Sequence, residues 1–158
     1  MGKTIRILGI DPGLQRCGWG VIDYTDNKLS FVAGGCIKPP TKAAMAQRLG
    51  MIDIELEKII SEWKPDEAAI EETFSNTNAA STLKLGMARG AAFVAPARAG
   101  LTVGEYAATT VKKSVVGAGH ADKTQVQMMV KVLLPKASFE IADTADALAV
   151  AICHAHHR

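Results

Sequence analysis

Cysteine is scarce in this sequence. The chain has three cysteines among 158 residues, at Cys17, Cys36 and Cys153. Because their number is odd and their spacing is wide, they form no disulfide framework and match no zinc-ligand pattern. We therefore expect each of them to be a small buried apolar residue in a protein of the reducing cytoplasm.

Long apolar stretches are also lacking. No run approaches the about 20 apolar residues that a membrane-spanning helix needs, so we expect no membrane partner. Lys3 and Arg6 lead directly into a strand-like segment, which does not fit a secretory signal. Internal repeats, low-complexity tracts and linkers are absent as well. We therefore expect the 158 residues to form one domain, covering residues 1–158.

A strong net charge is absent too. Lys and Arg number 18 against 16 Asp and Glu, which gives a net charge of +2 and a pI near 8.5. This balance permits nucleic-acid binding but does not argue for it. If several acids gather in one pocket, however, the remaining surface is more basic than the total indicates.

The first part of the sequence has the pattern of three strands. Residues 5–10 are mostly branched and apolar, as in a buried central strand, and Pro12 and Gly13 end this segment with a sharp bend. Residues 17–24 and 29–37 are predicted to form two further strands. Because the connections are short, we expect an antiparallel three-stranded meander.

Helices and strands alternate in the rest of the sequence. Apolar residues at helical spacing predict a long helix over residues 41–63, and such a crossover makes the next strand parallel to the first. The later elements are predicted at residues 67–72 (strand), 76–98 (helix), 101–105 (strand), and 107–116, 123–134 and 143–157 (helices). The expected fold class is α/β: a mixed five-stranded sheet, an antiparallel meander plus parallel strands, flanked by helices.

Four acids stand at the ends of these predicted elements. Asp11 and Glu71 fall at the carboxyl ends of two strands that we expect to be parallel neighbours, where functional crevices of such sheets lie. Asp143 and Asp146 are three residues apart at the start of the last helix, so they can share one face. Clustered carboxylates suit Mg²⁺ or Mn²⁺, and two such ions about 3.5–4 Å apart can promote phosphodiester hydrolysis.

Each acid also has an ordinary structural interpretation. Asp11 is a favoured first residue of a turn, and Asp143 could cap the last helix with Asp146 in its first turn. An acid at a strand end such as Glu71 is often only solvated, and the strand pattern does not choose between it and Glu72. The combination of four acids, more than any single one, therefore favours a metal site.

A series of motifs runs along almost the whole chain. They are ILGIDPG at 7–13, GWGV at 18–21, AIEETF at 69–74, NAASTLKLGMARG at 78–90, EYA at 105–107, VKKSVVG at 111–117, KTQV at 123–126 and ADTADALA at 142–149. In order and spacing, these motifs resemble those of the RuvC family of Holliday-junction resolvases. The resemblance implies an RNase H-like fold and a homodimer that binds four-way DNA junctions.

The same resemblance implies a chemistry for the acids. It implies a structure-selective endonuclease of recombination and DNA repair, which resolves junctions by paired symmetric nicks that leave 5′-phosphate and 3′-hydroxyl ends. Asp11, Glu71, Asp143 and Asp146 match the catalytic, metal-binding tetrad, and the match selects Glu71 over Glu72. The expected cofactor is Mg²⁺, with two ions per site in the presence of substrate and Mn²⁺ as a substitute. A branch-migration complex, RuvA–RuvB, is the expected protein partner.

DNA-binding residues also follow from the resemblance. Lys112 and Lys123 match basic positions near the active centre, and Phe74 matches a position from which an aromatic ring could stack on an unpaired base. Weaker candidates for backbone contacts are Lys84, Arg89 and Lys113. Without the resemblance, the lysines would be read as solvated and Phe74 as a core residue. The small residues of segment 76–98 suit close approach of this helix to its own sheet or to a partner subunit in a dimer. For the histidines near the chain end we expect a structural role.

Other functions fit part of this pattern. An RNase H-like nuclease could act on RNA or on unbranched DNA, because the fold alone does not define the substrate. A non-catalytic module could bind junctions without cutting them. An actin-like or sugar-kinase-like ATPase also begins with a strand, Asp and Gly, but such proteins duplicate the fold, and 158 residues hold one copy.

Overall fold

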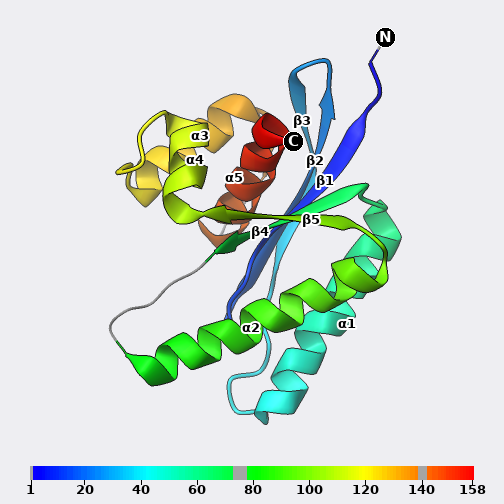
Figure 1. The fold of residues 1–158 in the computed structure, drawn as a ribbon, viewed down its shortest axis with the longest axis vertical. Helices are drawn as coiled ribbons and strands as arrows, with labels where there is room; N and C mark the ends of the chain where they lie inside the picture. Colours follow the sequence, from blue (N-terminus) through cyan, green and yellow to red (C-terminus); the bar gives the residue numbers. More distant parts are fainter. Residues whose placement is uncertain (1, 73–77, 139–141) are drawn as a thin grey trace.

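A five-stranded mixed sheet forms the centre of the protein, as shown by a computed structural model that describes residues 2–72, 78–138 and 142–158 (Figure 1). The strand order is β3-β2-β1-β4-β5. β1 pairs antiparallel with β2 and β2 with β3, whereas β4 lies parallel to both β1 and β5. The strands are β1 (Ile5–Asp11), β2 (Cys17–Thr25), β3 (Lys28–Ile37), β4 (Glu67–Glu72) and β5 (Thr102–Ala107). The expected antiparallel meander with added parallel strands is thereby confirmed.

Five helices accompany the sheet in the described part of the chain. They are α1 (Met45–Trp63), α2 (Ala79–Arg98), α3 (Ala108–Val116), α4 (Lys123–Leu133) and α5 (Ala142–His157). The first of them begins later than the predicted residue 41, because a turn in which Ala43 N donates to Pro40 O precedes it. At the start of α2 the Asn78 side chain accepts hydrogen bonds from the N–H groups of Ala80 and Ser81, which is a regular helix cap.

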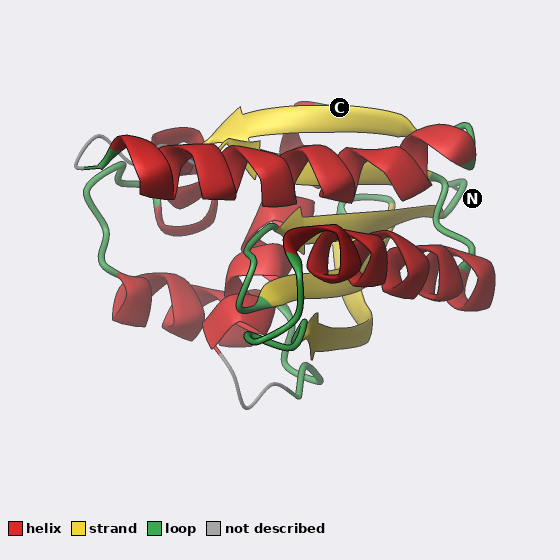
Figure 2. Cartoon of the chain, turned by 90° about the horizontal axis from the view of Figure 1, so that it is seen from below, coloured by secondary structure: helices red, strands yellow, loops and turns green. Residues whose placement is uncertain are grey.

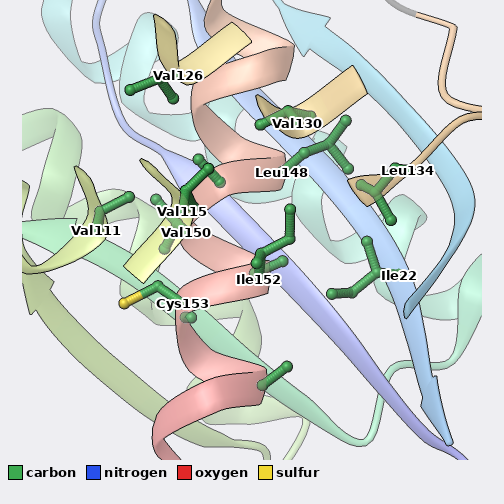
Figure 3. Close-up of a cluster of buried hydrophobic side chains, with 14 of the residues drawn as sticks. Ile22, Val111, Val115, Val126, Val130, Leu134, Leu148, Val150, Ile152 and Cys153 are labelled. Atoms are coloured by element: carbon green, nitrogen blue, oxygen red, sulfur yellow. The ribbon is translucent and has the colours of Figure 1, made fainter. Parts of the chain in front are cut away.

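The helices cover both faces of the sheet (Figure 2). On one face α5 packs across β1 and β2, and α3 and α4 pack on α5 in turn. Figure 3 shows the resulting apolar core, in which Leu148 and Ile152 of α5 lie among side chains of α3, α4 and β2. On the other face, Ile52 and Leu56 of α1 and Ala92 of α2 pack against β1 and β4. No helix within the described residues is long and apolar enough to cross a membrane.

Helix α5 lies unusually close to the sheet, and two glycines make this possible. A Cβ atom at Gly9 of β1 would be 2.1 Å from Ala147 O, and one at Gly18 of β2 would be 2.2 Å from Asp143 O. The Thr144 hydroxyl also donates to Gly35 O at 2.9 Å. Because backbone meets backbone here, the amino end of α5 is fixed beside the carboxyl end of β1.

The expected burial of the cysteines is confirmed for two of the three and is wrong for Cys36. Cys17 and Cys153 are buried apolar residues, and Cys36 is half-buried at the end of β3. Burial raises the pKa of the Cys17 thiol to about 12, so this side chain is an uncharged core residue near neutral pH.

Candidate active site

Three acids meet where α5 reaches the end of β1. Asp11 is the last residue of β1, and Asp143 and Asp146 lie one turn apart on the first part of α5. Each offers a carboxylate oxygen, and these three oxygens lie within 4.8 Å of one another. Since α5 already includes Ala142, Asp143 lies inside the first turn and does not cap the helix. This geometry is suited to a shared hard divalent cation.

Glu71 lies next to this group on the neighbouring strand. Ile70 of β4 is paired with Ile10 of β1, so Glu71 and Asp11 occupy equivalent places at the carboxyl ends of two parallel strands. Successive side chains of a strand point to opposite faces, so Glu71 and Glu72 cannot both face α5. Glu71 shares a hollow of about 160 Å³ with Asp146. Glu71 does not belong to the group of three acids within 4.8 Å, but its negative charge acts on Asp11.

Burial and charge repulsion raise the pKa of three carboxyl groups, those of Asp11, Glu71 and Asp146. Burial, followed by the negative charge of Glu71, raises the pKa of Asp11 to about 8. Burial and the neighbouring Asp146 raise the pKa of Glu71 to about 7. The pKa of Asp146 is also raised, mainly by burial, although Lys123 opposes the shift. The four acids therefore repel one another when ionised, and bound divalent cations would remove that repulsion.

Two basic side chains flank the acids on the side of Glu71 and Asp146. Lys112 of α3 and Lys123 of α4 line the same hollow as these acids. Lys123 Nζ lies 3.8 Å from Asp146 Oδ2, and Asp122 caps α4 immediately before it. Lys123 thus places a positive charge beside the acids, where it could stabilise the charge of a phosphate group. The structure thus brings together the two lysines and all four acids that the sequence singled out.

The other predicted DNA-binding residues are more scattered. Lys113 is exposed on α3, next to Lys112, and Lys84 is exposed on α2. Arg89 is committed to an ion pair with Glu105 of β5 and lies 4.8 Å above the Phe93 ring. Phe74 lies outside the described residues.

One side-chain cluster at the other end of the sheet serves the fold. The buried His154 ring lies 2.7 Å from Glu67 Oε1 and 2.7 Å from the Tyr106 hydroxyl. Arg158 makes two further hydrogen bonds to the same carboxylate, at 3.0 and 2.8 Å. This network connects the end of α5 to β4 and β5, in agreement with the structural role expected for the histidines.

Sequence reasoning missed two basic residues, Arg16 and Arg48, that lie near the predicted Lys84. Arg16, in the loop after β1, has its Nη1 atom 3.9 Å from Asp143 Oδ2. Arg48 of α1 and Lys84 of α2 line the same large hollow as Arg16 and Asp11. The only sequence signal was the proximity of Arg16 to Asp11. Arg48 reaches the site solely because α1 packs beside this loop.

The sheet order and the acidic centre together define an RNase H-like protein whose acids are suited to divalent cations and phosphate chemistry. Comparison with known proteins then gives the family: the model described as "Crossover junction endodeoxyribonuclease RuvC" matches residues 7–154. The chain therefore belongs to the RuvC family.

Individual relatives agree with this assignment. Crossover junction endodeoxyribonuclease RuvC of Rhodopseudomonas palustris is 60% identical over 99% of this chain and 90% of its own length. The protein of the same name from Xanthobacter autotrophicus is 61% identical over 99% of this chain and 92% of its own. The solved structure of T. thermophilus RuvC in complex with a Holliday junction substrate has 32% identity and a TM-score of 0.89, covering 97% of this chain and 94% of its own. The expected RNase H-like fold and the family resemblance are both confirmed.

Proposed function

We propose that this protein is a Holliday-junction resolvase, a structure-selective endonuclease acting in DNA recombination and repair. It cuts four-way DNA junctions by paired symmetric nicks that leave 5′-phosphate and 3′-hydroxyl ends. The observation that carries this proposal is the group of Asp11, Asp143 and Asp146 in a chain whose RuvC match covers residues 7–154. A relative with 32% identity that was solved with a Holliday junction substrate supports junction DNA as the ligand.

The four acids are proposed as the ligands of the metal. Asp11 lies close to both acids of α5, and the charge of Glu71 also acts on it, which supports Asp11 as the central ligand. The raised pKa values of Asp11 and Glu71 fit a site that is complete only with cations. We propose Mg²⁺ as the cofactor, two ions per site with substrate and Mn²⁺ able to substitute; bound there, the metal lowers the pKa of the attacking water and stabilises the leaving oxygen.

The protein's own cations have a separate task. Lys112 and Lys123 are proposed to bind a non-bridging oxygen of the scissile phosphate and to stabilise the charge that develops on it. Phe74 remains a prediction for stacking on a base at the junction centre. Lys113 remains a prediction for a backbone contact, and Arg89 could make one only by leaving Glu105.

We also propose that the protein is a homodimer that pairs through α2. Three large apolar side chains of this helix are exposed: Leu83 by 61%, Met87 by 37% and Val94 by 43%. Gly86 and Gly90 on the same helix have open space where a side chain would be. A twofold dimer would present two identical acidic centres to a junction of near-twofold symmetry.

Sedimentation tests the dimer. Gly86→Glu should shift the protein from dimer to monomer, whereas Gly50→Glu, a matched change at an open glycine of α1, should not. A Gly86→Glu variant that remains dimeric would reject α2 as the contact.

The RuvA–RuvB complex as a partner, the cytoplasm as the location and one domain over residues 1–158 are proposals that rest on the family and the composition.

A panel of labelled DNAs tests the activity. Four-way, Y-shaped and linear duplexes are incubated with the protein, with Mg²⁺ and with excess chelator. We expect nicks only in the four-way junction and only with Mg²⁺, and we expect Asp11→Asn to bind the junction without cutting it. Equal cutting of linear duplex would instead indicate a general RNase H-like nuclease, and junction binding without any nick would indicate a non-catalytic module.

A further inference from the structure

A large hollow lies beside Asp11 and Asp143, apart from the hollow that Lys112 and Lys123 line with Glu71 and Asp146. It measures about 680 Å³ and is bordered by the loop after β1, by α1 and by α2. Asp11 and Asp143 lie on its border, and its walls carry three cations, Arg16, Arg48 and Lys84. The smaller hollow at Glu71 and Asp146 shares no lining residue with it.

These three cations have weaker ion pairs, or none among the described residues, than several other basic residues of the protein. Arg6 pairs with Asp23 at 2.8 Å, Arg98 with Asp53 at 2.7 Å, and Arg158 with Glu67 at 2.8 Å. By contrast, Arg48 and Lys84 make no ion pair within the described ranges 2–72, 78–138 and 142–158. Because this positive charge is not neutralised by acidic side chains, the hollow is suited to an anionic ligand.

Arg48 is fixed in this hollow, whereas the other two cations can adjust. The Nη2 atom of Arg48 donates to Leu14 O at 3.0 Å, which holds the guanidinium against the loop. The Nε–H group of Arg48 has no hydrogen-bond partner among the described residues, so the planar fork keeps a donor available to an acceptor. The Arg16 side chain is 61% exposed, and its 3.9 Å approach to Asp143 is a weak surface ion pair that a stronger anion can replace.

The position of the hollow identifies the anion. A DNA strand crossing the four acids would place phosphates on both sides of the one being cut, with Lys112 and Lys123 on one side and this hollow on the other. Guanidinium groups match phosphate oxygens in a bidentate manner, and a lysine adds a point charge. We propose that Arg16, Arg48 and Lys84 form a subsite for the backbone phosphate that flanks the scissile one. This inference rests on the proposed function, because it takes the acids as the cutting centre.

The subsite would have a consequence for cleavage. Holding a flanking phosphate fixes the register of the strand, so that one particular phosphodiester bond lies over the acids. Arg48 also anchors the loop that follows Asp11. Replacing Arg48 would therefore remove the phosphate contact and also disturb this loop. Arg16 and Lys84 are therefore the residues to change.

The experiment couples protein charges to single phosphates. Four-way junctions are made with one neutral methylphosphonate at successive positions of one strand, and binding is measured in the non-cutting Asp146→Asn background. At one position flanking the cut, the neutral linkage should weaken binding about 3–10-fold for this parent. Once Arg16→Ala and Lys84→Ala are added, the same linkage should have a much smaller effect, because only Arg48 of the subsite remains. The slope of log affinity against log salt should also fall by about 0.7–0.9 for each lost phosphate contact.

A matched control and two clear outcomes complete the design. Lys28→Ala, at the opposite end of the sheet from Asp11, should leave both the methylphosphonate pattern and the salt slope unchanged. If the double variant retains the full response to every methylphosphonate, or if Lys28→Ala abolishes it equally, the subsite does not exist. Nicking is measured in parallel with the unaltered protein. If the double variant loses its response to the methylphosphonate but the unaltered protein makes no nicks, the subsite stands and the resolvase activity is rejected. If the unaltered protein makes nicks but the double variant keeps its full response, the activity stands and the subsite is rejected.

Discussion

Replacing Asp11 by Asn should make the metal-free protein more stable, although it abolishes the proposed activity. The pKa of Asp11 is raised from 3.8 to about 8 by burial and by the other acids. Below the lower value the carboxyl group is neutral in both the folded and the unfolded protein and has no effect. Between the two values the unfolded chain gives up the proton and the folded chain keeps it, so stability decreases as pH rises.

The size of the effect follows from the shift. Each pKa unit corresponds to about 1.4 kcal/mol, so at neutral pH the shift of Asp11 corresponds to a cost of up to about 4 kcal/mol for the metal-free fold. Asn keeps the size and polarity of the side chain but removes the charge. We therefore expect a gain of about 2–4 kcal/mol, which for a protein of this length raises the melting temperature by about 5–10 °C.

Thermal unfolding with excess chelator measures this gain at several pH values. The advantage of Asp11→Asn should be largest at about pH 8, shrink toward about pH 5, and close when Mg²⁺ is added, because only the unaltered site gains from the metal. Glu62→Gln, an exposed acid on α1, is the control and should change little at any pH. An Asp11→Asn variant that melts at or below the temperature of the unaltered protein at pH 8 in chelator would refute the electrostatic argument.

Three further predictions concern the supports of the site and of the fold. Gly18→Ala places a methyl group 2.2 Å from Asp143 O, so it should cost about 1–3 kcal/mol of stability and reduce nicking more than tenfold; unchanged nicking would mean that the position of α5 is not critical. Lys123→Met should slow nicking about 10–100-fold with little change in junction affinity. Lys136→Met, the control, should change neither the rate of nicking nor the junction affinity. Glu67→Gln should lower the melting temperature by about 3–6 °C near neutral pH. The pKa of Glu67 is lowered to about 2, chiefly by Arg158, so this difference should be complete above about pH 4.5 and disappear toward pH 2.

The strand ends were the part of the site that the sequence could predict. The apolar run before Asp11 and the Pro-Gly bend after it place a carboxylate at the end of β1, and the crossover length places Glu71 on a parallel neighbour. Periodicity could not choose between Glu71 and Glu72, because it does not tell which face of β4 meets α5. In the structure, Gly9 of β1 meets α5 and is paired with Ala69 of β4. Glu71, two residues after Ala69, therefore points to the same face as Ala69, and Glu72 points to the other.

Contacts between distant segments could not be predicted from local pattern. The hollow of Arg16, Arg48 and Lys84 is assembled from a loop and two helices, and Arg16 and Arg48 lie outside the motifs of the sequence, so no local pattern joins them to Lys84. Similarly, Arg89 resembled a DNA contact by position, and only the fold places Glu105 beside it. The start of α1 at Met45 instead of residue 41 reflects a turn set by Pro40, which apolar spacing does not reveal.

Resolution of a plasmid-borne cruciform tests the central claim most directly. A supercoiled plasmid that extrudes a four-way junction is converted to a linear molecule only when both nicks are made within the lifetime of one complex. The account predicts linear product with Mg²⁺, ends that ligase can rejoin, and no product from Asp11→Asn. Nicked circles alone, or linear product formed equally by Asp11→Asn, would contradict it.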